Sequence, residues 1–204
     1  MNVRGLTASH DAEWLRSRFA EKTLPYEPFA TGDGHLFRGA GEIRPASVLV
    51  PVVQREPELT LLLTRRTAHL HDHAGQISLP GGRAEEGESP EDTALRETAE
   101  EIGLHSRHVE ILGTLSDYVT VTGYRVTPVI GLVAPPFDLQ PDTFEVAEIF
   151  EVPLSVVLDP ANHQRNRVVA EGVERRYYAM PYGPYYIWGA TAGMLMNLYQ
   201  FLTR

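Results

Sequence analysis

Two apolar runs early in the chain have the pattern of buried β-strands. Residues 46–53, ASVLVPVV, and residues 59–66, LTLLLTRR, stand on either side of the turn-forming stretch QREPE. A strand that is covered on both faces reads as a nearly continuous apolar run, whereas a half-exposed strand alternates apolar and polar residues. We therefore predict two central sheet strands here. Further strand patterns occupy residues 108–117, 125–134 and 148–158, the last passing into a short helix.

Three other segments carry the spacing of apolar residues that is typical of helices, namely residues 9–21, 89–103 and 189–203. In the second of them, Ser89 suits the N-cap, Pro90 suits the first helical position, and Gly103 suits the end of the last turn. In the first, Trp14, Leu15 and Phe19 fall near one face. We predict a helix at each of the three segments.

The order of these elements favours an α/β fold. Strand and helix patterns interleave without a regular strand–helix–strand repeat, and residues 165–180 read as a hairpin that turns near Glu171 and Gly172. The stretch ATGDGHLFRGAGEIRPA, which follows the first helix, is rich in turn formers. We predict an N-terminal helix and linker over residues 1–45 and one main domain over residues 46–204.

Composition narrows the class of protein. The 204 residues carry a net charge of −9 and include no cysteine. An acidic chain is poorly suited to nucleic acid or an anionic membrane surface, and a chain without cysteine forms neither disulfides nor thiolate zinc sites. The N-terminal stretch lacks the apolar core of a signal peptide, and no segment reaches the length of a membrane span. We predict a cytoplasmic protein without nucleic-acid or membrane partners, either a monomer or a homodimer.

The helix at residues 89–103 concentrates negative charge. Between Glu85 and Glu101 there are eight acidic residues and one basic residue, Arg96. Glu97, Glu100 and Glu101 stand at the three- and four-residue spacings that bring side chains together, where like charges destabilise a helix. Clustered carboxylates are the ligands that Mg²⁺ or Mn²⁺ prefers. A solvated charged face is the alternative interpretation.

The residues before that helix favour the metal site. Residues 66–88 read as an irregular connection, and its part LPGGRAEEGE offers Gly81 and Gly82, which let backbone N–H groups approach phosphate closely. The spacing of Gly82 and Gly87 imitates the start of a Walker A loop, but Glu88 stands at the lysine position. A carboxylate there would repel phosphate, so we exclude a P-loop.

Residues 82–104 resemble the Nudix box, G-x5-E-x7-R-E-U-x-E-E-x-G-U, in which U is aliphatic. Gly82, Glu88, the run RETAEEIG at 96–103 and Leu104 match it in register, and only Thr98 departs from it, on the packing face of the helix. The resemblance implies a Nudix fold, an α/β/α sandwich around a mixed β-sheet, and hydrolysis of a nucleoside diphosphate that is linked to another group.

The same resemblance implies roles for individual residues. Glu97, Glu100 and Glu101 would bind Mg²⁺ or Mn²⁺, Arg96 would orient them, and the Gly81–Gly82 loop would shape the site. Many Nudix enzymes also place a carboxylate from later in the chain near the metals. Glu145 and Glu148 both stand where such a residue is expected, and we name Glu145 as the candidate general base.

A second signature lies upstream of the box. Residues 62–82 are similar to the pattern L-L-T-x-R-[SA]-x3-R-x3-G-x3-F-P-G-G of the coenzyme A pyrophosphatase branch of the family. The predicted substrate contacts at these positions are Arg66, His71, Gly75, Gly81 and Gly82. Thr67, His71 and Leu79 differ from the pattern, and the change at His71 matters most because imidazole is mostly neutral at pH 7 whereas a guanidinium is always charged.

The branch resemblance implies cleavage of coenzyme A or acyl-coenzyme A to 3′,5′-ADP and 4′-phosphopantetheine. The stretches TVTGYRVTPVIG and IWGATAGM extend the likeness to the C-terminus. Three alternatives stay open: a pyrophosphatase for ADP-ribose, NADH or a related dinucleotide, a non-catalytic nucleotide sensor, and, more remotely, an isomerase.

Two weaker candidates complete the sequence interpretation. His69, His71 and His73 alternate, and we favour contact with solvent or substrate phosphate over metal ligation because a carboxylate site is already present. Arg175 and Arg176 precede an aromatic group. An aromatic run of this kind is more often core or interface than a stacking surface for adenine.

Overall fold

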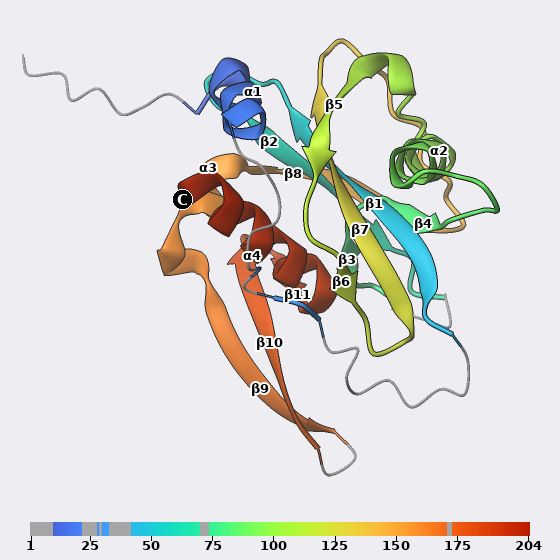
Figure 1. Cartoon of the computed structure of the whole chain (residues 1–204), viewed down its shortest axis with the longest axis vertical. Coiled ribbons are helices and arrows are strands. Elements are labelled where there is room, and N and C mark those ends of the chain that lie inside the picture. Colours follow the sequence, from blue (N-terminus) through green and yellow to red (C-terminus); the bar gives the residue numbers. More distant parts are fainter. Residues whose placement is uncertain (1–9, 22–27, 29, 33–41, 70–73, 171–172) are drawn as a thin grey trace, which may run out of the picture.

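A large mixed β-sheet forms the centre of the protein (Figure 1). The computed structural model describes residues 10–21, 28, 30–32, 42–69, 74–170 and 173–204. The main path of the sheet runs in the order β3 (Ile77–Ser78), β2 (Thr60–Arg66), β1 (Arg44–Val53), β7 (Tyr124–Val133) and β5 (Val109–Thr114). Off this path, β4 (Gly81–Arg83) pairs with β1, β6 (Tyr118–Val119) with β7, and β8 (Val146–Pro153) with β2. The β1 and β7 strands are parallel, and the other pairs are antiparallel.

Helices cover both faces of this sheet. Successive strand residues point to opposite faces, so Leu61 packs in the apolar cluster that includes Leu198 of α4 (Gly189–Thr203). Its neighbour Leu62 packs in a separate cluster with Ala94 of α2 (Pro90–Ile102). This helix–sheet–helix layering confirms the predicted α/β sandwich around a mixed sheet.

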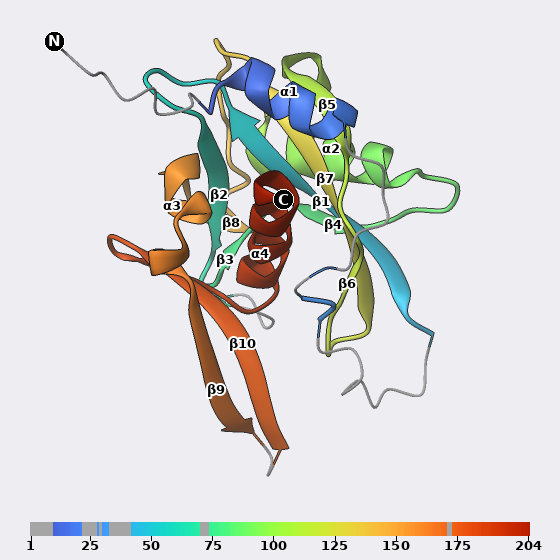
Figure 2. The same cartoon turned by 60° about the vertical axis from the view of Figure 1, so that its left-hand side comes forward.

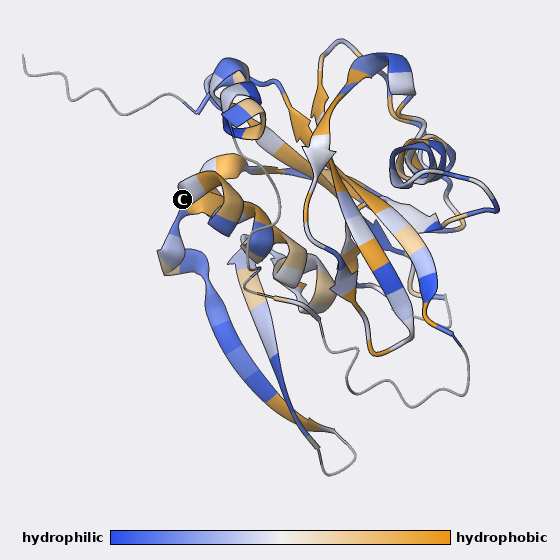
Figure 3. Ribbon diagram, in the orientation of Figure 1, coloured by the Kyte–Doolittle hydropathy of each residue, from blue (hydrophilic) through white to orange (hydrophobic). Residues whose placement is uncertain are grey.

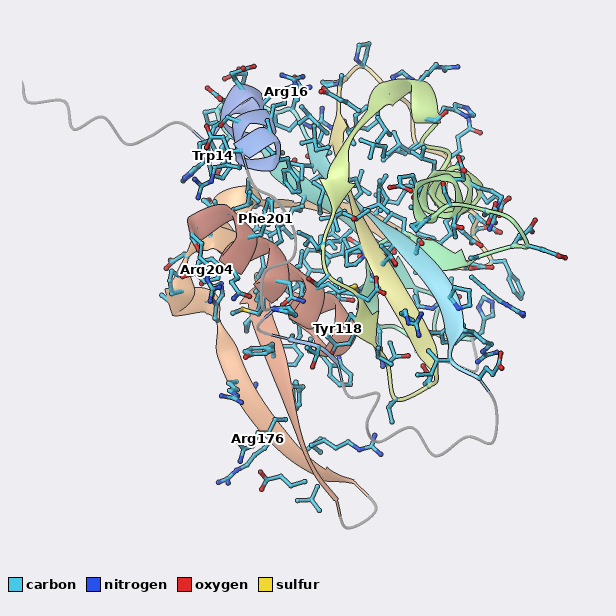
Figure 4. The ribbon with its side chains drawn as sticks, in the orientation of Figure 1. Trp14, Arg16, Tyr118, Arg176, Phe201 and Arg204 are labelled. Atoms are coloured by element: carbon cyan, nitrogen blue, oxygen red, sulfur yellow. The ribbon has the colours of Figure 1, made fainter. Side chains whose placement is uncertain are left out.

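The N-terminal helix is attached to the body of the protein. Helix α1 (Ala12–Glu21) lies within the predicted range, and its Phe19 ring is 4.5 Å from Phe201 of α4. Arg16 pairs with Glu110 of β5 at 2.8 Å, and Arg18 donates to the carbonyl of Leu202. Figure 4 shows Arg16 on α1 and Phe201 on the neighbouring end of α4. The division of the chain at residue 45 stays a prediction.

A second sheet projects from the body of the protein (Figure 2). It has the order β11 (Tyr185–Trp188), β10 (Val173–Tyr182) and β9 (Gln164–Ala170). The predicted hairpin at 165–180 is confirmed in β9 and β10, while its predicted turn at Glu171 and Gly172 lies outside the described residues. Figure 3 shows that β9 is mostly hydrophilic, with an apolar segment near its far end.

Two short strands lie inside the stretch that the sequence analysis treats as irregular. β3 and β4 are only two and three residues long, and Gly81 and Gly82 are weak strand formers. They are strands because β2 and β1 offer edges for pairing, which is a tertiary contact that local sequence does not reveal. The remaining helical elements are α3 (Leu154–Leu158), η2 (Ser106–His108) and η3 (Pro160–Asn162).

None of the helices in the described part of the chain has the length and apolar character that a membrane span needs.

Candidate active site

Helix α2 is fixed at both ends by the residues that the sequence predicts. Ser89 has an extended backbone, and its hydroxyl accepts the N–H of Asp92 at 3.1 Å. Gly103 ends the helix with φ 72° and donates its N–H to the carbonyl of Ala99. The predicted caps are confirmed, and they fix where the helix begins and ends. Ala94 and Ile102 pack in an apolar cluster with the sheet, which turns one face of the helix inward.

The three predicted metal-binding carboxylates of α2 lie in different surroundings. The Glu101 residue is buried, with 7% of its surface exposed. The side chains of Glu97 and Glu100 are 20% and 61% exposed. The carboxylates therefore pass from the interior to the surface rather than forming a uniform solvated face, and the alternative of a simple charged surface does not describe Glu97 or Glu101.

Arg96 offsets part of the repulsion among these carboxylates. Its Nη1 atom lies 2.8 Å from Glu97 and 3.2 Å from Glu100. The other side of the guanidinium is held by Glu88, through Nε at 2.6 Å and Nη2 at 3.0 Å, and by the carbonyl of Arg83. This two-point contact lowers the pKa of Glu88 to about 2. Arg96 is thus a fixed donor beside the acidic face.

The glycine loop approaches the carboxylates closely. The Gly81 N–H donates to Glu101 Oε2 at 3.3 Å. A Cβ on Gly82 would lie 2.5 Å from both Cδ and Oε2 of Glu97, which is closer than non-bonded atoms approach. Gly81 has φ +149°, and a Cβ there would lie 2.3 Å from the carbonyl oxygen of Ser47. Gly81 therefore requires glycine, whereas a side chain at position 82 would displace the Glu97 carboxylate, and the predicted Gly81–Gly82 loop lies against the carboxylates.

Glu145 reaches the same place from the loop before β8. That loop is attached to the end of α2, because the Asp142 N–H donates to the carbonyl of Glu101 at 2.8 Å. Glu145 donates its N–H to Asp142 and accepts the N–H of Thr67 at its carbonyl. Its carboxylate is close enough to raise the pKa of both Glu97 and Glu101.

Burial and mutual repulsion raise the free energy of the ionised forms of Glu97 and Glu101. Burial raises the pKa of Glu101 to about 8, against the opposing effects of the Gly81 N–H and the nearby Arg66 guanidinium, while Glu145 and Glu97 raise it further. The pKa of Glu97 is raised as well, chiefly by burial. A cation between them would lower the free energy of all three ionised groups.

The oxygen donors of this cluster suit a hard divalent cation. Glu97, Glu101 and Glu145 are hard ligands, and the missing Cβ of Gly82 leaves the Glu97 carboxylate against open backbone. Within the described ranges, no three acidic or histidine side chains are arranged so that they could hold a metal ion as they stand. The residues fit a metal in chemistry, and Arg96 holds Glu97 and Glu100 in the present arrangement.

The structure places the other predicted site residues in two regions, one beside the carboxylates and one beside β3. Arg66 lies near Glu101, whereas Gly75 lines a separate pocket on the side of β3 that faces β11. Glu148 is engaged away from the carboxylates, with Arg65 at 2.7 Å and with the hydroxyl of Tyr185 at 2.7 Å. Of the two late-chain carboxylates, only Glu145 is among the groups that raise the pKa of Glu97 and Glu101.

The histidines add nothing to the cluster in the described chain. His71 and His73 lie outside the described residues. The His69 ring packs edge-on against Phe144 with centroids 4.9 Å apart.

One residue that holds the site is missed by the sequence reasoning. In the sequence analysis, Glu88 is used only as one of the residues that match the Nudix box and as the charge that excludes a P-loop. In the structure it also accepts the Thr93 hydroxyl and the Glu85 N–H, both at 2.9 Å, besides its contacts to Arg96. Glu88 lies in the loop before α2, and its contact with Arg96 could not be read from the eight-residue separation, because side chains on one helix pair at three- and four-residue spacings.

Comparison with known proteins gives the family. A sequence model of the NUDIX domain matches residues 43–172. The proteins named uncharacterized Nudix hydrolase NudL from Yersinia pestis (strain Pestoides F) and Yersinia pseudotuberculosis (serotype O:1b, strain IP 31758) are each 37% identical over 196 residues, which cover 96% of both chains. The chain belongs to the Nudix hydrolase family.

Two solved structures are among those similar to this chain. The Nudix hydrolase RenU from M. smegmatis has a TM-score of 0.49 and 25% identity, over 56% of this chain and 73% of its own. The MutT protein from Methanosarcina mazei Go1 has a TM-score of 0.47 and 23% identity, over 58% of this chain and 83% of its own. Nudix hydrolases act on small-molecule nucleotide derivatives and generally use divalent metal ions.

Proposed function

We propose that this Nudix hydrolase is a divalent-metal-dependent diphosphatase that cleaves coenzyme A or acyl-coenzyme A to 3′,5′-ADP and (acyl-)4′-phosphopantetheine. The observation that carries the proposal is the convergence of Glu97, Glu101 and Glu145 beside Gly82. An acidic protein that acts on a diphosphate needs a cation between its own carboxylates and the phosphates. The substrate name rests on the signature at residues 62–82.

Glu97, Glu100 and Glu101 are the residues that we assign to Mg²⁺ or Mn²⁺. When bound, the metal neutralises the diphosphate and lowers the pKa of an attacking water. Glu101 is held by the Gly81 N–H, and Glu97 lies against Gly82, so both carboxylates have fixed positions at the foot of the loop. Glu100 is the more exposed of the three and stands toward solvent.

Arg96 would act as a positioning residue. Its Nη1 atom is shared by Glu97 and Glu100, and its other nitrogens are held by Glu88. Because the guanidinium is planar and permanently charged, this arrangement fixes both the direction and the charge of the donor. Arg96, which is itself held by Glu88, would thus orient the carboxylates of Glu97 and Glu100.

Glu145 is the candidate general base. Its carboxylate comes from a loop that is independent of α2, yet it raises the pKa of Glu97 and Glu101. A base must lie within reach of the attacking water, and a carboxylate that shares the cluster without being part of the helix satisfies that requirement. It would accept the proton that water loses when its oxygen attacks phosphorus.

The substrate contacts would lie along β2 and the glycine loop. Arg66 is near the cluster, and its Nε atom is buried with no hydrogen-bond partner among the described residues. Such a group gains free energy when an anionic oxygen arrives. Gly81 and Gly82 lie against Glu101 and Glu97 beside this arginine, and His71 remains a predicted contact outside the described residues.

A pyrophosphatase for ADP-ribose, NADH or a related dinucleotide is the second candidate. It is favoured by His71, which replaces a signature arginine and would weaken the grip on an additional phosphate. A nucleotide sensor without activity is disfavoured, because a binding module has no need of the complete carboxylate set.

A substrate panel tests the proposal. Purified protein with Mg²⁺ or Mn²⁺ is incubated with coenzyme A, an acyl-coenzyme A, ADP-ribose and NADH, and the products are separated and quantified. We expect equal amounts of 3′,5′-ADP and 4′-phosphopantetheine from coenzyme A, and no product with a chelator. Intact coenzyme A alongside rapid cleavage of ADP-ribose or NADH would overturn the substrate assignment.

A further inference from the structure

A pocket of about 410 Å³ lies beside β3, apart from the carboxylate cluster. Strand β11 contacts β3 here, and Arg65 and Gly75 line the pocket. Two consecutive residues of β2 therefore lie at different sites: Arg65 lines this pocket, and Arg66 lies near Glu101. Strand β2 is paired with β1 and β3 on one side and with β8 on the other, so one extended ligand can reach both places only by passing the end of β2 at Arg66.

Two large aromatic side chains line the pocket without being buried. Tyr186 and Trp188 are 42% and 38% exposed, although aromatic rings are usually covered. The core does not use them, because neither ring belongs to the two apolar clusters of the described chain. An exposed pair of rings at a pocket is typical of a binding surface.

Neighbouring side chains of the three-stranded sheet hold these rings in place. The Trp188 ring meets Tyr177 edge-on, with centroids 5.5 Å apart. The Tyr186 hydroxyl accepts the Asn166 side-chain N–H at 3.1 Å and shares a hydrogen bond with Tyr177. The stacking faces are therefore ordered before a ligand arrives, which reduces the entropy cost of binding.

The lining of the pocket also includes a charged side chain and an open stretch of backbone. Arg65 is the charged residue among the described residues that line it, and Glu148 fixes its guanidinium at 2.7 Å. Gly75 has φ +68°, and a Cβ there would meet no atom within 4 Å, so the backbone of this segment is open to the pocket. Flat aromatic faces together with backbone groups and a guanidinium match a nucleobase, which stacks through its faces and forms hydrogen bonds along its edges.

We propose that the pocket between β3 and β11 binds the purine base of a nucleoside diphosphate derivative, by stacking on Trp188 and Tyr186. The inference deepens the proposed function and rests on it, in that the diphosphate of the same molecule would lie at the Glu97–Glu101–Glu145 cluster. A flexible acyl or pantetheine chain would gain little from the charged side chain and the open backbone.

Tryptophan fluorescence tests the pocket without any turnover. The chain has two tryptophans, so Trp14→Phe leaves Trp188 as the only indole. In the presence of a chelator, AMP should quench this fluorescence to saturation, and ribose 5-phosphate, which lacks the base, should not. Tyr186→Ala in the same background should weaken the response to AMP about tenfold, and Tyr186→Phe should retain it. Absent quenching by AMP, equal quenching by ribose 5-phosphate, or quenching only by 4′-phosphopantetheine would overturn the proposal.

Steady-state kinetics test the same pocket independently. Trp188→Ala should raise the KM for the preferred substrate about tenfold and leave kcat within about threefold, because stacking holds the base and not the reacting atoms. Val169→Ala removes apolar surface from β9, where the side chain is 70% exposed, and is the matched control with unchanged kinetics. If no diphosphate substrate is cleaved, the proposed function fails, and the AMP titration still decides the base pocket.

Discussion

A Cβ atom at position 82 would lie 2.5 Å from the carboxyl carbon of Glu97. Gly82 and Glu97 are therefore matched, and Gly82→Ala should displace the carboxylate that we assign to metal. We expect kcat/KM to fall at least tenfold while the midpoint of thermal unfolding changes by only a few degrees. Steady-state kinetics over a range of Mg²⁺ concentrations should show that the variant needs more metal.

Gly87→Ala is the control for this change. Gly87 also needs glycine, since its φ is +85°, but a Cβ there meets nothing within 4 Å. Its substitution should cost about 1 kcal/mol of stability through backbone strain and leave the rate of catalysis unchanged. Equal losses of activity in the two variants would show that strain in the loop, rather than contact with Glu97, explains the result.

Substitutions of Glu145 and Glu148 should affect different kinetic constants. Glu145 raises the pKa of Glu97 and Glu101, so Glu145→Gln should lower kcat by roughly 10²-fold or more. Glu148 holds Arg65 and Tyr185 instead, so Glu148→Gln should leave kcat within about threefold and act mainly on KM. The reverse order of the two kcat values would remove Glu145 as the candidate base.

The elements with strong local signals were the predictable part of this protein. Helix α2 could be located from Ser89, Pro90 and Gly103 because capping is a local property of the chain. The sequence names Glu145 as the candidate base but gives no physical reason to prefer it to Glu148, because the difference depends on how the loop before β8 is attached to Glu101 through Asp142. The strand at Gly81–Arg83 was hidden for the same reason, since only the edge of β1 makes it a strand.

Thr98 occupies a position where the Nudix box has an aliphatic residue. The side chain is buried, with 1% of its surface exposed, and its hydroxyl has no hydrogen-bond partner among the described residues. Thr98→Val keeps the shape and removes the unsatisfied polar group, so it should stabilise the protein by about 1 kcal/mol. Thermal unfolding should then shift upward by roughly 2–4 °C. Thr98→Ser retains the hydroxyl and should not stabilise, and a lower midpoint for Thr98→Val would contradict the assignment.

Glu151 should make stability depend on pH. Its carboxylate accepts hydrogen bonds from Arg55 at 2.7 Å and from Thr60 at 2.5 Å, and the Arg55 contact is the main cause of its lowered pKa. A lowered folded-state pKa contributes stability above the ordinary value, and this contribution is lost as pH falls through the folded value. Glu151→Gln should therefore cost about 1 kcal/mol at pH 7, and the difference from wild type should shrink below about pH 4. Urea unfolding at a series of pH values measures it, and a difference that grows toward low pH would refute this sign.

The most direct test of the account is the fate of water oxygen during turnover. Coenzyme A is incubated with the protein and Mg²⁺ in H₂¹⁸O, and the products are analysed by mass spectrometry, with Glu101→Gln as the control for the carboxylate site. A hydrolase of the proposed kind should place one ¹⁸O atom in the phosphate of 3′,5′-ADP or of 4′-phosphopantetheine, and Glu101→Gln should lower the rate by orders of magnitude. Unlabelled products, or an equal rate for Glu101→Gln, would contradict metal-dependent hydrolysis at the Glu97–Glu101–Glu145 cluster.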